Sequence, residues 1–141
     1  TMIESRRMEE RVPIYPRPEQ LKTLLAGPPD RPVVMLNLLR YKERADAPDE
    51  GVSGEEAYHR YGEPMRKIVE SHGGRILYMG RVDQMVIADV EPGYHAIALV
   101  EYPSRAKFVE LATSAEVAEI GVHRTAGLES QWLVATTQEE R

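Results

Sequence analysis

Residues 33–41 have the sequence VVMLNLLRY and predict a β-strand that is apolar on both of its faces. Side chains alternate between the two faces of a strand, so the even positions from Val34 to Leu38 share one face and the odd positions share the other. We expect helices to pack on the even face, because Val34, Leu36 and Leu38 are all apolar. The odd face carries the amide of Asn37 among apolar residues, and it needs a different cover because it is too apolar to be left to water.

A second predicted strand, HAIALVEY at 95–102, is also apolar on both faces. We expect Ile97, Leu99 and Glu101 to share a face with Asn37. A second copy of the chain is the simplest cover for that face, since an exposed apolar sheet must bury itself against another element. The prediction is a homodimer whose sheets pack together, with Asn37 and Glu101 lining a shared cavity.

The remaining elements follow from capping and turn signals. Pro18 starts a short helix that ends before Gly27, and Ser53 with Glu56 forms an S-x-x-E capping box at the start of a longer helix. Pro64 should kink that helix. Further strands are expected over 75–82, 84–90 and 130–137. Ser104 should cap a helix that runs to about Ala112, and Ser114 should cap a short one over 115–121. The order βα, a β-rich centre and αβ predicts an α+β protein with the ferredoxin-like split βαβ pattern.

The length of 141 residues suits one domain, with an N-terminal arm and short helix over 1–30 and a ferredoxin-like domain over 31–141. Eighteen basic and 23 acidic side chains give a net charge of −5, which disfavours nucleic acid as a partner. The sequence has no cysteine, no membrane-length apolar stretch and no signal-like segment, so we expect a cytoplasmic protein with no membrane association. We interpret Thr1, which precedes Met2, as an added residue.

Several segments together resemble a bacterial family known as domain of unknown function 1330, DUF1330. They are VVMLNLLRYK, GEEAYHRYGEPMRKIVESHGGRILYMG, VEYPSRAKFVEL and HRTAGLES-x-WLVAT, which span residues 33–136. The YPSR-x-x-F and GGR-x-L pieces are the most specific. The resemblance implies the dimeric α+β barrel superfamily, whose members include cofactor-free monooxygenases, heme-degrading enzymes and muconolactone-isomerase-like proteins. It implies no particular activity.

Five residues are candidates for substrate binding, and no catalytic residue is assigned. Asn37 could hydrogen-bond a ligand carbonyl or enolate, as an Asn on a barrel strand does in relatives of the resembled family, or it could satisfy neighbouring backbone. Those relatives pair the Asn with a Trp, whereas the single Trp here is on the last strand. Tyr41 and Glu101 are the expected neighbours of Asn37. Arg124 could grip a carboxylate and His123 could act as an acid or base, both just before the last strand, or both could be structural.

Other features have simpler interpretations. Tyr58 and Tyr61 project together from a helix and are more often core or interface residues than site residues. The scattered histidines predict no metal site, and no motif predicts a bound cofactor. We expect a homodimer that binds a small anionic or carbonyl-bearing molecule, with cofactor-free isomerase or monooxygenase chemistry as one option. The alternative is a non-catalytic small-molecule-binding or heme-binding, stress-associated dimer.

Overall fold

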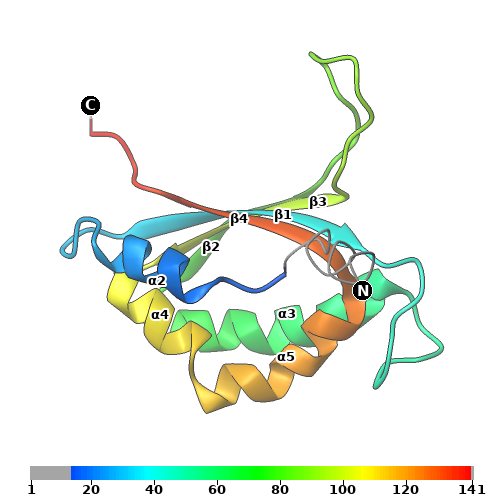
Figure 1. Ribbon diagram of the computed structural model, residues 1–141, viewed down its shortest axis with the longest axis horizontal. Coiled ribbons are helices and arrows are strands. Elements are labelled where there is room, and N and C mark those ends of the chain that lie inside the picture. Colours follow the sequence, from blue (N-terminus) through cyan, green and yellow to red (C-terminus); the bar gives the residue numbers. More distant parts are fainter. Residues whose placement is uncertain (1–13, 141) are drawn as a thin grey trace, which may run out of the picture.

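The computed structural model describes residues 14–140, which fold into a four-stranded antiparallel sheet with helices on one side (Figure 1). The strands are β1 (Val33–Tyr41), β2 (Arg75–Arg81), β3 (Ala96–Tyr102) and β4 (Leu128–Thr136), in the sheet order β2-β3-β1-β4. Helix α3 (Gly54–Ser71) joins β1 to β2, and helices α4 (Arg105–Ala112) and α5 (Ala115–Gly127) join β3 to β4. This is the ferredoxin-like topology, and the predicted α+β class is confirmed.

Local sequence signals fix most helix starts. The hydroxyl oxygen of Ser53 accepts a hydrogen bond from the backbone N–H of Glu56 at 3.1 Å, and Ser104 and Ser114 cap α4 and α5 in the same way. The short helix predicted from Pro18 is α2 (Pro18–Leu25). Helix α3 continues through Pro64 and ends before Gly73, whose φ of +86° is a left-handed conformation that glycine adopts readily. Residues 1–13, which include most of the expected N-terminal arm, lie outside the described residues.

Two predicted elements are wrong. Residues 84–90, expected as a strand, form irregular structure and bends in an arm that projects from the sheet between β2 and β3 (Figure 1). Polar and turn-forming residues flank this segment, and a backbone bond from Val82 N–H to His95 C=O at 2.9 Å closes the base of the arm. Helix α5 runs six residues beyond the predicted 115–121 to Gly127. His123 and Arg124 are therefore in the last turns of α5 and do not lead directly into the last strand.

The assignment of the two sheet faces is also wrong. In β1 the odd positions are the helix-covered ones, with Val33, Met35 and Leu39 buried and the even positions partly exposed. The strand register places Asn37 opposite Ala98 and Leu36 opposite Leu99. Asn37 therefore faces the helices, while Leu99 is on the other side of the sheet. Both faces are apolar, so apolarity alone could not decide which one the helices would cover.

The hydrophobic core lies between the sheet and the helices, and at one end two glycines let helices α3 and α5 approach closely. Its buried residues include Met35 from β1, Val69 from α3 and Phe108 from α4. At that end, the start of α3 meets the end of α5, and a Cβ on Gly127 would lie 2.3 Å from the backbone oxygen of Gly54. Only residues without a side chain allow the two backbones to approach this closely.

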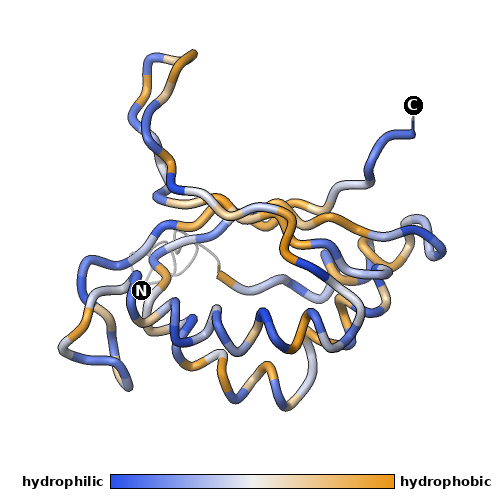
Figure 2. Tube along the Cα trace, turned by 180° about the vertical axis from the view of Figure 1, so that it is seen from behind, coloured by the Kyte–Doolittle hydropathy of each residue, from blue (hydrophilic) through white to orange (hydrophobic). Residues whose placement is uncertain are grey.

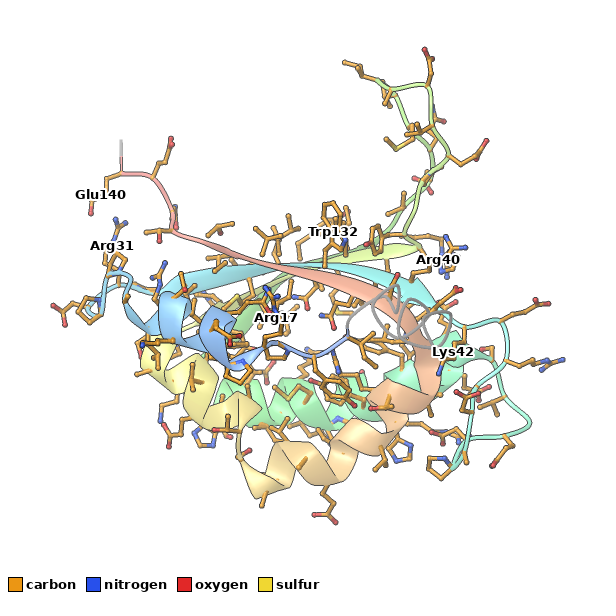
Figure 3. The ribbon with its side chains drawn as sticks, viewed as in Figure 1. Arg17, Arg31, Arg40, Lys42, Trp132 and Glu140 are labelled. Atoms are coloured by element: carbon orange, nitrogen blue, oxygen red, sulfur yellow. The ribbon has the colours of Figure 1, made fainter. Side chains whose placement is uncertain are left out.

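No helix of residues 14–140 covers the second side of the sheet, which we call the outer face. Trp132 projects from it, away from the helices (Figure 3), and is 59% exposed. The strand register brings the apolar side chains of three strands together there: Val34, Leu36, Leu38, Ile97, Leu99, Trp132 and Val134. The arm rises on the same side of the sheet, and its tip is apolar (Figures 1 and 2). The most exposed apolar residues of the arm are Val86 and Ile87. No helix among residues 14–140 is long and apolar enough to cross a lipid bilayer.

A tyrosine-lined cavity between sheet and helices

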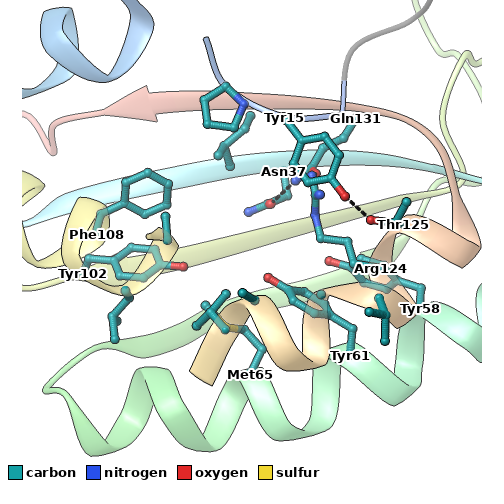
Figure 4. A pocket seen from close by; sticks show the side chains of 18 of the residues that line it. Tyr15, Asn37, Tyr58, Tyr61, Met65, Tyr102, Phe108, Arg124, Thr125 and Gln131 are labelled. Carbon is teal, nitrogen blue, oxygen red and sulfur yellow. Dashed lines mark hydrogen bonds between the residues drawn. The ribbon is translucent and has the colours of Figure 1, made fainter. Parts of the chain in front are cut away.

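The inner face of the sheet and the helices enclose a cavity of about 590 Å³ (Figure 4). Strands β1, β3 and β4 supply its roof, α3, α4 and α5 supply its walls, and the segment before α2 crosses it. Its lining is mostly apolar and aromatic. The aromatic members are Tyr15, Tyr58, Tyr61, Tyr102 and Phe108. Such a volume, with few polar groups, is typical of a small-molecule site.

Three polar side chains form a continuous line along one side of the cavity. Gln131 Nε2 donates to Asn37 Oδ1 at 2.7 Å, and Arg124 Nη2 donates to Gln131 Oε1. Asn37 Nδ2 donates to the backbone oxygens of Met35 and Ala98, both at 3.3 Å. The amide of Asn37 is thus satisfied within the chain, and two of its partners are backbone groups. Of the two roles considered for Asn37, these contacts are those of the second, in which it satisfies neighbouring backbone.

Arg124 brings a positive charge to this line. Its guanidinium lies over the Tyr15 ring, with Cζ 5.1 Å from the ring centroid, and Nη2 also donates to the backbone oxygen of Ile14. No carboxylate of residues 14–140 is within ion-pair distance of it. A partly buried cation with only neutral partners is electrostatically suited to an anion or a carbonyl oxygen.

Three tyrosines present hydroxyls to the cavity. Figure 4 shows the hydroxyls of Tyr58, Tyr61 and Tyr102 directed towards the same space. None of the three makes a hydrogen bond to a residue in the described part of the chain, and no fully buried polar atom there lacks a partner, so these hydroxyls are open to the cavity. Burial raises the pKa of each phenol above its ordinary value. They are therefore neutral at neutral pH and can donate hydrogen bonds.

The candidates proposed from the sequence separate into two groups. Asn37 and Arg124 both line the cavity and are joined through Gln131. Glu101 does not line it: the register pairs Glu101 with Val34 on the outer face, where its carboxylate meets Arg75 at 3.1 Å. The predicted proximity of Glu101 to Asn37 is wrong, because the odd residues of β1 lie on the helix-covered face and not on the other face as predicted. The odd residues of β3 do lie on the face away from the helices, as predicted.

Tyr41 and His123 are also outside the lining. Tyr41 shares a face with Asn37, as predicted, although that face is the helix-covered one, and it packs in a separate cluster with Leu39 and Leu128. Burial, reinforced by the nearby Glu55 carboxylate, raises the pKa of Tyr41 to about 12. His123 Nδ1 lies 2.7 Å from the carboxylate of Asp49.

Asp49 is a buried carboxylate that ties a loop to two helices. It is only 2% exposed, and besides His123 it accepts a hydrogen bond from Arg60 Nη1 at 2.6 Å. Burial opposes ionisation of Asp49, but the hydrogen bonds from His123 and Arg60 outweigh it and keep the pKa below its usual value. The contact between His123 and Asp49 therefore gives His123 a structural role, because it links α5 to the loop after β1.

Comparison with known proteins identifies the family. The family profile of DUF1330, described as a domain of unknown function, matches residues 50–137, which is more than half of the chain. This chain belongs to the DUF1330 family. The resemblance inferred from the sequence is thereby confirmed. A search of curated proteins found no match to this chain.

Solved structures similar to this DUF1330 chain include RPA0582, a protein of unknown function from Rhodopseudomonas palustris. It is 32% identical with a TM-score of 0.83, over 92% of this chain and 99% of that one. A structure of methylated RPA0582 gives 31% identity and a TM-score of 0.82, over 92% and 97% of the two chains. A dimeric protein of unknown function with a ferredoxin-like fold from Bacteroides fragilis is more distant, at 14% identity and a TM-score of 0.43 over 76% and 96%.

Sequence reasoning missed part of the cavity in this DUF1330 chain. Tyr58 and Tyr61, predicted to be core or interface residues, line the cavity, and their spacing of three on a helix is the signal that they share a face. Gln131 and Tyr15 gave no signal at all, because their roles depend on contacts with distant residues. Among residues 14–140 no group of three or more histidine and acidic side chains is placed to hold a metal ion.

Proposed function

We propose that this DUF1330 protein binds a small organic molecule carrying a carboxylate or carbonyl group in the tyrosine-lined cavity. The position of Arg124 carries this proposal. It is the only charged side chain among the described lining residues, and its described partners are all neutral. Charge-assisted hydrogen bonds are stronger than those between neutral groups, so an anionic or carbonyl oxygen is the favoured partner.

The other lining groups support binding over acid–base catalysis. The described lining contains no carboxylate, histidine or lysine, and burial raises the pKa of Tyr58, Tyr61 and Tyr102 above its ordinary value. A general acid or base is most effective when its pKa lies near the working pH, and burial moves these three phenols further from that condition. We therefore favour a binding role over isomerase chemistry. A heme would also find no histidine in the described lining as an axial ligand.

The assembly we propose is a homodimer formed through the outer face. The apolar side chains of β1, β3 and β4 on that face are partly exposed in a single chain, and the arm adds further exposed apolar residues beside them. A second copy would cover both, and two such sheets packed face to face would give the α+β barrel. Because Asn37 faces the helices, the proposed ligand cavity would be on the helix side of each sheet, outside that barrel.

Titration calorimetry with phenylacetate and the uncharged 2-phenylethanol tests the binding role. We expect the carboxylate to bind and the alcohol to bind at least about tenfold more weakly, since a charge-assisted hydrogen bond contributes roughly 1.5–3 kcal/mol. Arg124→Gln should abolish that preference, and Arg124→Lys should weaken phenylacetate binding because lysine lacks the planar fork. Arg66→Gln, at an exposed ion pair on α3, is the matched control.

The outcomes separate clearly. Equal affinity of the wild type and Arg124→Gln for phenylacetate, or no carboxylate binding by the wild type at millimolar concentration, would overturn the proposal. Loss of binding in Arg66→Gln as well would show that charge at a distance, and not the contact with Arg124, is responsible.

A further inference from the structure

The segment that crosses the cavity, Ile14–Arg17, occupies the position where the proposed ligand would sit. It leads into α2 and separates the main cavity from a second hollow of about 320 Å³. Both hollows are lined by Tyr15, Pro16 and Arg124. Without this segment, the two hollows would have no wall between them at that point.

Two groups of the segment contact the guanidinium of Arg124. The backbone oxygen of Ile14 accepts from Nη2 on the edge of the guanidinium, and the ring of Tyr15 lies over its face. The Tyr15 hydroxyl hydrogen-bonds to Thr125 Oγ1 in the next position of α5 (Figure 4). A carbonyl oxygen, an aromatic ring and a para hydroxyl are thus bound together at one place.

The segment is held by few interactions. Ile14, Tyr15 and Pro16 belong to no helix or strand, and their backbone groups make no hydrogen bond to the backbone of any residue within 14–140. Tyr15 is 58% exposed. Segments with few buried contacts and no ladder of backbone hydrogen bonds open at low cost in free energy.

We infer that Ile14 and Tyr15 are an internal substitute for the ligand, and that the molecule that displaces them is an aromatic carboxylate. This inference rests on the proposed function. The carboxylate would replace the Ile14 oxygen at the edge of the Arg124 guanidinium, and the ring would replace that of Tyr15 over its face. A molecule with one methylene between ring and carboxylate, such as an arylacetate, lets both groups reach Arg124 at once.

Competition by a tethered group lowers the apparent affinity in proportion to the fraction of molecules in which the site is free. Weakening the segment should therefore tighten ligand binding. If Tyr15 were instead a wall of the site, removing its ring would take away contacts with the ligand and loosen binding. The two roles predict changes of opposite sign in the same measurement.

Calorimetry with 4-hydroxyphenylacetate, phenylacetate and cyclohexylacetate provides the test in the full chain. We expect affinity to fall in that order in the wild type, and Tyr15→Ala to bind phenylacetate at least about threefold more tightly. Tyr15→Phe and Thr125→Val each remove the same hydrogen bond, so each should tighten binding less and their effects should not add. Leu25→Ala, at an exposed apolar position on α2 outside both hollows, is the control.

NMR spectroscopy gives an independent readout. Saturating phenylacetate should abolish the nuclear Overhauser contact between the Tyr15 ring and the Thr125 side chain if the segment is displaced, and persistence of that contact at saturation would overturn the inference. Unchanged or weaker phenylacetate binding by Tyr15→Ala, with Arg124-dependent binding intact in the wild type, would also reject it while leaving the proposed function standing. No binding by either protein would reject both.

Discussion

The side-chain amides of Asn37 and Gln131 join β1 to β4 across the inner face of the sheet, with a nitrogen-to-oxygen distance of 2.7 Å. We expect Asn37→Leu to lower the free energy of unfolding by about 1–3 kcal/mol, because it removes partners from Gln131 and from two backbone oxygens. Urea unfolding would measure the change. In a double-mutant cycle with Gln131→Leu, strictly additive losses would show that the pair contributes nothing as a pair.

Gly54 and Gly127 should be among the positions of the fold that tolerate substitution least. A Cβ at Gly127 would lie 2.3 Å from the Gly54 backbone oxygen, so Gly127→Ala must separate α3 from α5. We expect a loss of about 2–3 kcal/mol in unfolding free energy. Gly62→Ala is the matched control on α3, where an added methyl meets open space and should stabilise by about 0.5–1 kcal/mol. Similar effects of the two substitutions in chemical denaturation would contradict the close approach.

Asp49 should contribute to stability in a pH-dependent way. Its pKa is lower in the folded chain than in the unfolded chain, so its contribution is present above the unfolded value and is lost as the pH falls through the folded value. Asp49→Asn should cost about 2–3 kcal/mol at neutral pH and flatten this acid dependence. Asp46→Asn removes an exposed carboxylate paired with Lys42 and should cost less than about 1 kcal/mol. Parallel acid-unfolding profiles for Asp49→Asn and the wild type would refute this role.

Buried phenols should make the protein sensitive to base. Burial raises the pKa of Tyr41 from 10.0 to about 12, so above pH 10 the unfolded chain releases a proton that the folded chain retains. The contribution of each such group to the free energy of unfolding is therefore fully present below pH 10. It declines towards pH 12 by about 1.4 kcal/mol per pH unit. Tyr41→Phe should decline less steeply in urea unfolding between pH 9 and 11. An unchanged slope in that variant would argue against a buried, protonated Tyr41.

The outer face should hold two copies together. We expect light scattering to give a dimer at micromolar concentration, with an interface above roughly 1,000 Å². Leu36→Glu places a charge at the centre of that face and should dissociate the dimer, shifting Trp132 fluorescence to the red. Leu25→Glu introduces the same charge on α2 as a control. A wild-type protein that remains monomeric would exclude this assembly.

How far the sequence could predict this structure varies with the range of the interactions. Capping serines and turn glycines act locally, and they located the helix starts at Ser53, Ser104 and Ser114 correctly. The facing of β1 depends on which of two apolar surfaces meets the helices, and β1 alone contains no preference between them. The sequence predicts Arg124 at the entry to the last strand because the predicted helix ends at Gly121, whereas α5 continues to Gly127. Its partners Tyr15 and Gln131 come from distant parts of the chain, and no local pattern could have placed them beside it.

The position of the cavity on the helix side of the sheet has a consequence for stoichiometry. In the proposed dimer the two cavities would be on opposite sides of a pair of packed sheets, which are typically about 10 Å apart face to face. Each cavity is lined by residues of one chain, so no group of the second copy need be shared between them. Ligand should then bind at one site per chain, following a simple hyperbola with a Hill coefficient of about one, since neither site would report its occupancy to the other.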